Sequence, residues 1–242
     1  MLPLISVVTP VHISTHKQLD YLRDLIVSFS RQRYTNKELI ISDDVGDARV
    51  ESLCHQMNTP GLNIKYYAAP VKGISSNLNF GISKARGKYV KILFHDDFFV
   101  KRYALLTICI RLTLSKKTWH VSASTHFQQS TSKFINTFYP RISDALLEGK
   151  NSISSPSVVT FKTFTSVTFC SELDYLMDCE WYLRMSHNFG SPIFGKIVFV
   201  ANRLHENQAT HWAQNQLQIE SVIAKNIHEK SKMSSRNCKC LL

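Results

Sequence analysis

Two adjacent carboxylates follow an apolar segment near the middle of the chain, in the sequence YVKILFHDD at 89–97. Two unit negative charges about 4 Å apart repel each other by about 4 kcal/mol at an effective dielectric constant of about 20. The pair is stable when water reaches it, when one carboxyl is protonated, or when a cation lies between the two. A hard divalent cation that also binds a phosphate accounts for this arrangement. Asp96 and Asp97 therefore predict phosphate-ester chemistry.

Polar residues also end two other strand-like segments. The apolar run at 4–8 is followed by Thr9 and Pro10, and the run at 38–42 is followed by Asp43 and Asp44. In sheets of parallel strands, ligands bind at the carboxyl ends of the strands. Three polar strand ends at one edge of a sheet predict a binding site there more strongly than any of them does alone.

The elements that would carry these residues alternate between strand-like and helix-like patterns. Strands are predicted at 4–8, 38–42, 63–67, 88–94, 120–124 and 196–201, and helices at 19–29, 50–57, 75–85, 100–114, 174–185 and from 216 onward. This alternation predicts an α/β fold with a mostly parallel central sheet and helices on both faces. Residues 125–165 are rich in Ser and Thr and lack clear periodicity, so we expect a connection that shapes one wall of a cleft.

Length and charge limit the classes of protein that fit. A chain of 242 residues suits one large α/β domain, and a hydrophobic fraction of 44% excludes disorder. Lys and Arg (29) exceed Asp and Glu (18), which favours an anionic partner: a nucleotide, a nucleic acid or an acidic membrane surface. No export signal and no run of about 18 apolar residues is visible, so we expect a cytoplasmic protein. The basic C-terminal helix is expected to be a solvated face that covers the core, with peripheral association at the inner face of the membrane as the alternative.

The sequence lacks both glycine-rich phosphate-binding motifs, G-x-G-x-x-G after a strand and G-x-x-x-x-G-K-[ST]. Its six cysteines are expected to be free thiols. A bound nucleotide would thus be held by carboxylates and a metal ion, without a glycine-rich loop.

Four segments in this order resemble the family 2 glycosyltransferases, which have the GT-A fold and use nucleotide sugars. They are ISVVTPV at 5–11, ELIISDD at 38–44, GISSNLNFGI at 73–82 with ARGKY at 85–89, and DCEWYLR at 178–184. The resemblance runs from residue 5 to about residue 205. It implies a GT-A domain at 1–215, with a Rossmann-like nucleotide-sugar-binding half at 1–124 and an acceptor half at 125–215. A basic helix and tail at 216–242 follow.

The resemblance also implies roles for single residues. Mn²⁺ or Mg²⁺ is expected on Asp97 and His205, and Asp178 is expected to be the general base of a single displacement with inversion, with Glu180 as the alternative base. Asp96 would contact the ribose or assist the metal. The family often has Asp-x-Asp at this motif, and the first of those acids is absent here. The set expected to bind the nucleotide sugar is Thr9, Pro10, Val11, Asp43, Asp44, Gly73, Asn79 and Asp96, with Asn79 preferred to Asn77.

The function predicted on this basis is metal-dependent, inverting transfer of a sugar from a UDP-linked donor to a hydroxyl group. The acceptor would be a glycan or a lipid-linked oligosaccharide, in the synthesis of cell-surface polysaccharide or lipopolysaccharide. A metal-dependent phosphohydrolase with the same strand-end aspartates is one alternative, although Val8 and Thr9 stand where its usual first-strand aspartate would be. A basic nucleic-acid-binding protein is the other, but the scattered basic residues count against it, so no nucleic-acid partner is expected.

Overall fold

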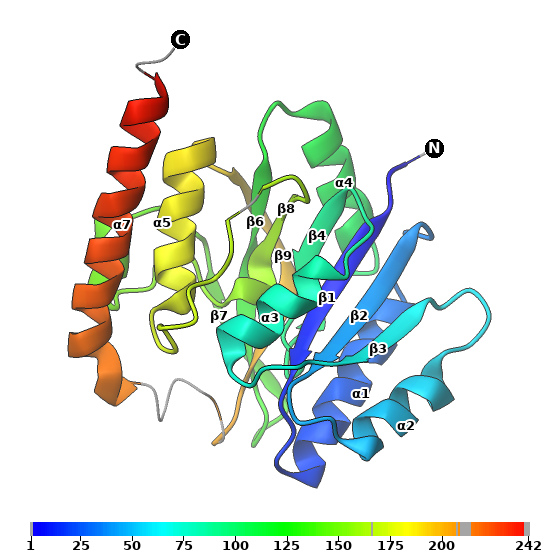
Figure 1. Ribbon diagram of the computed structural model, residues 1–242. Helices are drawn as coiled ribbons and strands as arrows, with labels where there is room; N and C mark the ends of the chain where they lie inside the picture. The colour runs from blue at the N-terminus through cyan, green and yellow to red at the C-terminus, as the bar shows by residue number, and fades with distance from the viewer. Residues whose placement is uncertain (1, 166, 207, 209–213, 240–242) are drawn as a thin grey trace.

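Parallel strands form one half of the sheet in the computed structural model, which describes residues 2–165, 167–206, 208 and 214–239 (Figure 1). They are β1 (Ile5–Val11), β2 (Lys37–Asp43), β3 (Ile64–Ala68) and β4 (Tyr89–Ile92), in the order β3-β2-β1-β4. Their carboxyl ends lie together, at the bottom of Figure 1. The predicted α/β fold is confirmed, and the strand ends meet at one edge as the sequence indicates.

The other half of the sheet is mixed. β8 (Val159–Lys162) pairs antiparallel with β4 and continues through β6 (Trp119–Gln128) and β9 (Ile193–Leu204) to the short β5 (Phe98–Phe99). β6 and β9 are parallel, and β7 (Lys133–Phe138) forms a hairpin with β6. Residues 125–165, expected as a connection, thus contain β7, β8 and the end of β6. The same region holds two short 3₁₀ helices at Asp144–Glu148 and Pro156–Val158.

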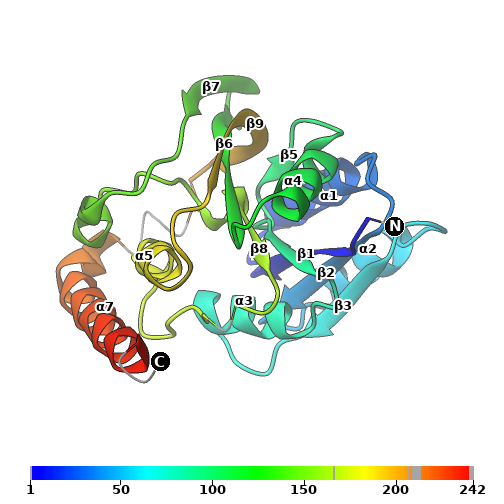
Figure 2. The ribbon, with the colours of Figure 1, turned by 90° about the horizontal axis from the view of Figure 1, so that it is seen from above.

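Helices cover both faces of the sheet because side chains alternate along each strand. Ile5 and Val7 of β1 pack in a core with α1 (His16–Ser30), α2 (Ala48–Met57) and α4 (Ala104–Leu114). Val8 packs in a second core with α3 (Ile74–Ser83) and α5 (Met177–Phe189) on the opposite face. In Figure 2 the sheet lies between these two groups of helices.

The C-terminal part of the chain adds a further helix beside α5. A 3₁₀ turn at Gln214–Gln216 leads into α7 (Leu217–Lys239), which lies along α5 in both ribbon views. Leu217, Ile223 and Ile227 contribute to the core that α5 shares with the sheet. Over the described part of the chain, every helix is too short or too polar to cross a membrane.

Candidate functional site

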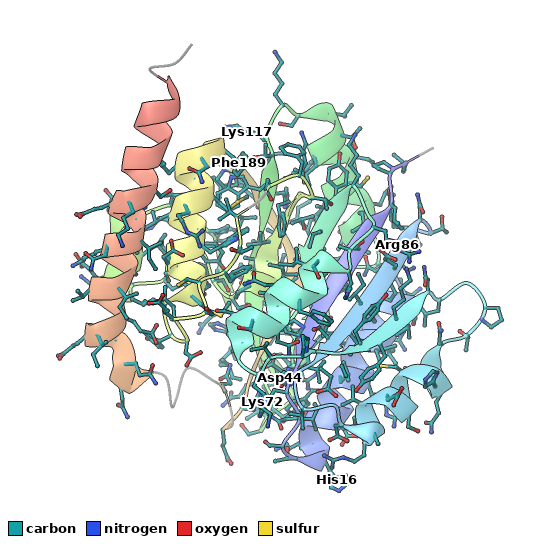
Figure 3. All side chains as sticks on the ribbon, viewed as in Figure 1. His16, Asp44, Lys72, Arg86, Lys117 and Phe189 are labelled. Atoms are coloured by element: carbon teal, nitrogen blue, oxygen red, sulfur yellow. The ribbon has the colours of Figure 1, made fainter. Side chains whose placement is uncertain are left out.

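A cleft of about 620 Å³ opens at the carboxyl edge of the parallel strands. One wall consists of the residues that follow β1, β2 and β4, and the other consists of the 149–156 segment and the start of α5. Figure 3 shows Asp44 and Lys72, which both line the cleft, at this lower edge, and Lys117, which precedes β6, at the opposite edge. The predicted residues that line the cleft are Pro10, Val11, Asp44, Gly73, Asp96, Asp97, Asp178 and His205.

Asp44 connects loops on the cleft wall that is formed at the ends of β1, β2 and β4. Its Oδ1 accepts a hydrogen bond from His12 Nδ1 (2.8 Å), and its Oδ2 accepts one from the main-chain N–H of Gly73 (3.1 Å). Gly73 has a φ of +109°, which is open to glycine and strained for other residues, and it leads directly into α3. The loops after β1 and β2 and the start of α3 are therefore held together by one carboxylate.

Thr9 and Asp43, which were expected in the site, lie outside the cleft. Thr9 is fully buried within β1. Asp43 is also fully buried, and its carboxylate accepts hydrogen bonds from Val45 N (3.0 Å), Asp47 N (2.7 Å) and the Tyr66 hydroxyl (3.1 Å). Asp43 thus closes the turn before α2, and its role in the structure is that of a turn residue.

The two asparagines of α3 have the opposite placement to the one expected. Asn77 lines the cleft, and its Nδ2 donates to the Val11 carbonyl (3.0 Å). The side-chain amide of Asn79 makes two hydrogen bonds with the main chain of Phe169. Its Nδ2 donates to the Phe169 carbonyl (2.8 Å), and its Oδ1 accepts from the Phe169 N–H (2.8 Å). The structure therefore does not bring Asn79 to the cleft. Residues two apart on a helix point about 200° apart, so only one of them can face the cleft.

Asp96 and His205 form a direct pair in the cleft, with 3.0 Å between Asp96 Oδ2 and His205 Nε2. Burial opposes ionisation of Asp96, but the hydrogen bond from His205 and the charges of His95 and His205 outweigh burial and lower the pKa of Asp96. The lowered pKa favours the carboxylate, which is the form that binds cations.

Asp97 is held by the protein instead. Its Oδ2 accepts from Asn202 Nδ2 (2.8 Å) and Ser155 Oγ (3.2 Å), and its Oδ1 accepts from the Arg203 main-chain N–H (3.0 Å). Burial and the neighbouring Asp96 raise the pKa of Asp97 to about 7. Of the two aspartates, the structure therefore brings Asp96 into direct contact with His205, whereas the Asp97 carboxylate accepts its hydrogen bonds from other residues.

Asp96 and His205 bring one carboxylate and one imidazole into direct contact. Within the described residues, no cluster of three or more His, Cys, Asp or Glu side chains is arranged to hold a metal ion. One carboxylate and one imidazole in contact suit an ion such as Mg²⁺ or Mn²⁺, which completes its coordination with water and substrate phosphates. The donor atoms at Asp96 and His205 therefore fit such an ion when a diphosphate is bound beside it.

Asp178 lies on the opposite wall, in the first turn of α5. Its Oδ2 accepts a hydrogen bond from Asn151 Nδ2 (2.9 Å), and its Oδ1 accepts from the Cys179 N–H (2.7 Å). Burial outweighs these bonds and raises the pKa of Asp178 to about 6. Glu180, the alternative base, is fully buried, paired with Arg184 (2.7 Å), and outside the cleft lining.

A buried carboxylate from α7 holds the wall that carries Asp178. Glu220 accepts hydrogen bonds from the main-chain N–H groups of Asp174 (3.1 Å), Tyr175 (3.0 Å) and Leu176 (2.8 Å), just before α5 begins. A negative charge at the start of a helix is stabilising because the helix dipole and the unpaired N–H groups are positive there. The cleft wall therefore depends on a helix about 40 residues farther along the chain.

Several cleft residues escaped the sequence analysis. His95 is part of the Asp96-Asp97 motif and could have been considered; burial lowers its pKa, and its Nε2 has no hydrogen-bond partner among the residues the structure describes. Other cleft residues lie in segments without a recognisable pattern, and only their position in the fold identifies them. Among them are His12, Lys72 and Asn151 in loops and Asn202 in β9.

Comparison with known proteins identifies a family and relatives by sequence. The model of glycosyl transferase family 2 matches residues 6–113. A Rickettsia typhi protein named as a glycosyltransferase is 29% identical over 234 residues, which are 89% of this chain and 69% of the relative. A Rickettsia bellii protein named in the same way is 25% identical over 224 residues, which are 86% of this chain and only 31% of the relative.

Solved structures share the fold at low sequence identity. Staphylococcus aureus TarS 1–349 in complex with UDP-GlcNAc has a TM-score of 0.65 and 15% identity, over 90% of this chain and 66% of that one. A mannosyltransferase from Pyrobaculum calidifontis in complex with GDP-Man and Mn²⁺ has a TM-score of 0.68 and 15% identity, over 94% of this chain and 65% of that one. Both are GT-A type structures.

Proposed function

The chain carries a glycosyltransferase family 2 domain on a GT-A fold, and we propose that it is a metal-dependent, inverting glycosyltransferase. We propose a UDP-linked sugar as donor and a hydroxyl group of a glycan as acceptor. The observation that carries the proposal is one cleft with the Asp96–His205 pair on one wall and Asp178 on the other. In this proposal the Asp96–His205 wall binds the charged leaving group, and the Asp178 wall provides the group that accepts the proton.

The donor-side wall supports binding of a nucleoside diphosphate. Pro10, Val11, Asp44 and Gly73 surround the position where a nucleotide would lie against the strand ends. TarS was solved with UDP-GlcNAc on the same fold, which supports UDP, whereas the mannosyltransferase was solved with GDP-Man. The donor is thus a proposal that a direct binding experiment decides.

Asp96 and His205 would hold the divalent ion. A bound Mg²⁺ or Mn²⁺ ion acts as a Lewis acid that stabilises the negative charge on the departing diphosphate. The low pKa of Asp96 keeps the carboxylate ionised for this purpose. Lys72 also lines the cleft and adds a positive charge on the donor side.

Asp178 would take the proton of the acceptor hydroxyl as that oxygen attacks the anomeric carbon. A base works best when its pKa lies near the operating pH, and a positioned base contributes about 10²–10⁴-fold to a rate. The pKa of about 6 makes Asp178 a stronger base than an exposed aspartate, while the carboxylate form still dominates at pH 7. Attack opposite the leaving group would invert the anomeric centre.

The acceptor side is proposed from the position of Asp178. Residues 149–156 and the start of α5 surround it, which supports an acceptor half at 125–215 and a donor half at 1–124. We propose a glycan or lipid-linked oligosaccharide as acceptor, in cell-surface polysaccharide or lipopolysaccharide synthesis, and cytoplasmic or peripheral membrane placement. The net charge of +11 is compatible with an anionic membrane surface near such an acceptor.

The test is a thermal-shift panel of UDP, UDP-sugars and GDP-sugars, each with and without Mn²⁺. A ligand that binds the folded state alone raises the melting temperature, so one donor class should stabilise the protein in a Mn²⁺-dependent manner. Asp96→Asn and His205→Ala should lose the Mn²⁺-dependent part, and the exposed Asp20→Asn should keep it. A protein that ignores every nucleotide, or one that releases phosphate from simple esters without any acceptor, would contradict the proposal.

A further inference from the structure

A second cavity, of about 460 Å³, lies away from the cleft, between the second half of α1, β5 and the β6–β7 hairpin. Among the residues described, none lines both cavities. Nothing in the proposed sugar transfer uses this second cavity, although its lining has a distinct chemistry. We call it the α1–β7 pocket.

Three phenyl rings form one side of the α1–β7 pocket. Phe98 and Phe134 both contact Phe127, with ring centroids 5.4 Å and 5.2 Å away, and the centroids of Phe98 and Phe134 are 6.3 Å apart. Phe134 is 57% exposed, on the hairpin strand β7. Exposed aromatic rings grouped in a concave site are typical of binding sites and uncommon on a plain solvated surface.

Cationic side chains surround these rings. Arg31, Lys101 and Arg102 are exposed, and within the described structure their side chains make no hydrogen bond or ion pair. The one carboxylate of the lining, Asp24, already accepts a hydrogen bond from Arg203 Nη2 (3.0 Å). Arg203 is buried, and its guanidinium lies 5.1 Å from the centroid of the Phe98 ring. Three cationic residues therefore line the pocket without an ion pair to any residue that the structure describes.

We propose that the α1–β7 pocket binds an anionic sugar, with the sugar ring against the phenyl groups and its phosphate or carboxylate on Arg31, Lys101 and Arg102. The C–H faces of a pyranose ring are apolar and pack against aromatic rings. Arginine and lysine bind phosphate and carboxylate groups through charge-assisted hydrogen bonds. A neutral sugar would leave the positive charges uncompensated, and inorganic phosphate would leave the phenyl rings exposed.

Arg203 connects this pocket to the cleft. Its Nε donates to the Asp96 carbonyl (2.9 Å), and its main-chain N–H donates to Asp97 Oδ1 (3.0 Å). The same residue thus forms part of the pocket wall and supports the two strand-end aspartates. The anionic sugar is either one unit of a charged glycan or a free sugar phosphate. Both present a sugar ring and an anionic group to the pocket.

The test is calorimetric titration of the full chain with glucose 6-phosphate, glucose, inorganic phosphate and a galacturonic acid tetrasaccharide. Glucose 6-phosphate or the tetrasaccharide should bind at least tenfold more tightly than glucose or phosphate. Tighter binding of the tetrasaccharide assigns the pocket to a charged glycan, and tighter binding of glucose 6-phosphate assigns it to a free sugar phosphate. Phe134→Ala and Lys101→Glu should each weaken this binding at least tenfold.

The matched controls are Tyr139→Ala, an equally exposed aromatic residue outside the pocket, and Lys116→Glu, an exposed cation outside it. Both should bind as the unchanged protein does. All four variants should keep the stabilisation by nucleotide and Mn²⁺, so a failure of this proposal is distinguishable from a failure of the donor site. Unchanged binding in Lys101→Glu, equal binding of inorganic phosphate, displacement by UDP, or retention on anionic vesicles alone would overturn the proposal.

Discussion

Asp178 gains basicity from the same burial that makes its charge costly in the folded protein. Its pKa is about 6 in the folded state, and an unfolded chain has an aspartate pKa of about 3.9. Below pH 4 the group is protonated in both states and has no effect. As the pH rises through 4 to 6, the unfolded state ionises first, and the folded state loses stability relative to it.

We therefore predict that Asp178→Asn is inactive and more stable. The rate of transfer should fall by at least about 10²-fold because the general base is lost. Stability at pH 8 should rise by up to about 3 kcal/mol, since the pKa is shifted by about two units and each unit corresponds to about 1.4 kcal/mol. Urea unfolding at about pH 8 and about pH 3 checks this, and the gain should vanish at the lower pH, which lies below both pKa values. In the unchanged protein, kcat/KM should rise with pH through about 6; a flat profile there would exclude Asp178 as the base.

Asp43 and Asp44 are neighbours of the same residue type with different contacts, and they provide a matched pair. Asp43→Ala leaves two main-chain N–H groups and the half-buried Tyr66 hydroxyl without their acceptor, so it should cost about 1–3 kcal/mol of stability. Its donor KM, measured at a temperature where the variant is folded, should stay close to that of the unchanged protein. Asp44→Ala should instead raise the donor KM several-fold. A larger KM effect from Asp43→Ala than from Asp44→Ala would contradict these roles.

At the scale of elements, α7 contributes to the site without entering it. Glu220→Ala removes the acceptor of the main-chain N–H groups before α5, and Glu220→Gln keeps one acceptor oxygen. We predict a fall of kcat of about tenfold for Glu220→Ala, since a displacement of about 1 Å at a reacting group can cost up to about 100-fold. The fall for Glu220→Gln should be smaller, because part of the support remains.

The donor wall is separate from this contact, so nucleotide-dependent stabilisation should persist in both Glu220 variants. Glu229→Ala, on the exposed side of the same helix, is the control and should have unchanged kcat. An equal loss of donor binding and kcat in Glu220→Ala would indicate general destabilisation and argue against a positioning role.

The elements that could be predicted from sequence are those with a strong pattern of their own. β1, β2 and β4 are apolar runs that end in polar residues, and α1 follows a helical spacing from Thr15, whose side chain caps it. β7 could not be predicted, because all of its residues are exposed or half-buried and no alternation marks them. The pairing of β8 between β4 and β6 depends on contacts between distant segments, which local patterns do not contain.

The sequence identifies which segments reach the site. It does not identify which side chains of those segments face the cleft, because that depends on how each strand end or helix is rotated in the fold. The Asp96-Asp97 motif identifies the strand end, but which carboxylate meets His205 depends on the turn after β4. Asn77 and Asn79 differ only by their phase on α3, and the packing of that helix sets this phase. Asp178 was predictable only through a family resemblance, since no pattern near it distinguishes it from Glu180.

At the scale of the whole molecule, both halves share one hydrogen-bonded sheet. β4 pairs with β8, so the proposed donor half at 1–124 and the proposed acceptor half at 125–215 are joined through the middle of the sheet. We predict one cooperative unfolding transition in urea, with coincident curves from far-UV circular dichroism and from tryptophan fluorescence. Trp119 lies in residues 1–124 and Trp181 in residues 125–215, and both pack in the core on the α3–α5 side, so they would report an early loss of that core. Two separated transitions would indicate that residues 1–124 and 125–215 fold independently.

The position of Glu220 in the chain also determines when the two walls of the cleft can be completed during synthesis of the protein. The strands that precede Asp44 and Asp96 come early in the chain, since β1, β2 and β4 all lie within the first 92 residues. The acceptor wall, however, lacks its carboxylate clamp until translation has passed residue 220. His205, the proposed partner of Asp96 in metal binding, also comes late in the chain, so a nascent chain would lack both the proposed metal site and the supported acceptor wall until its last fifth has been made.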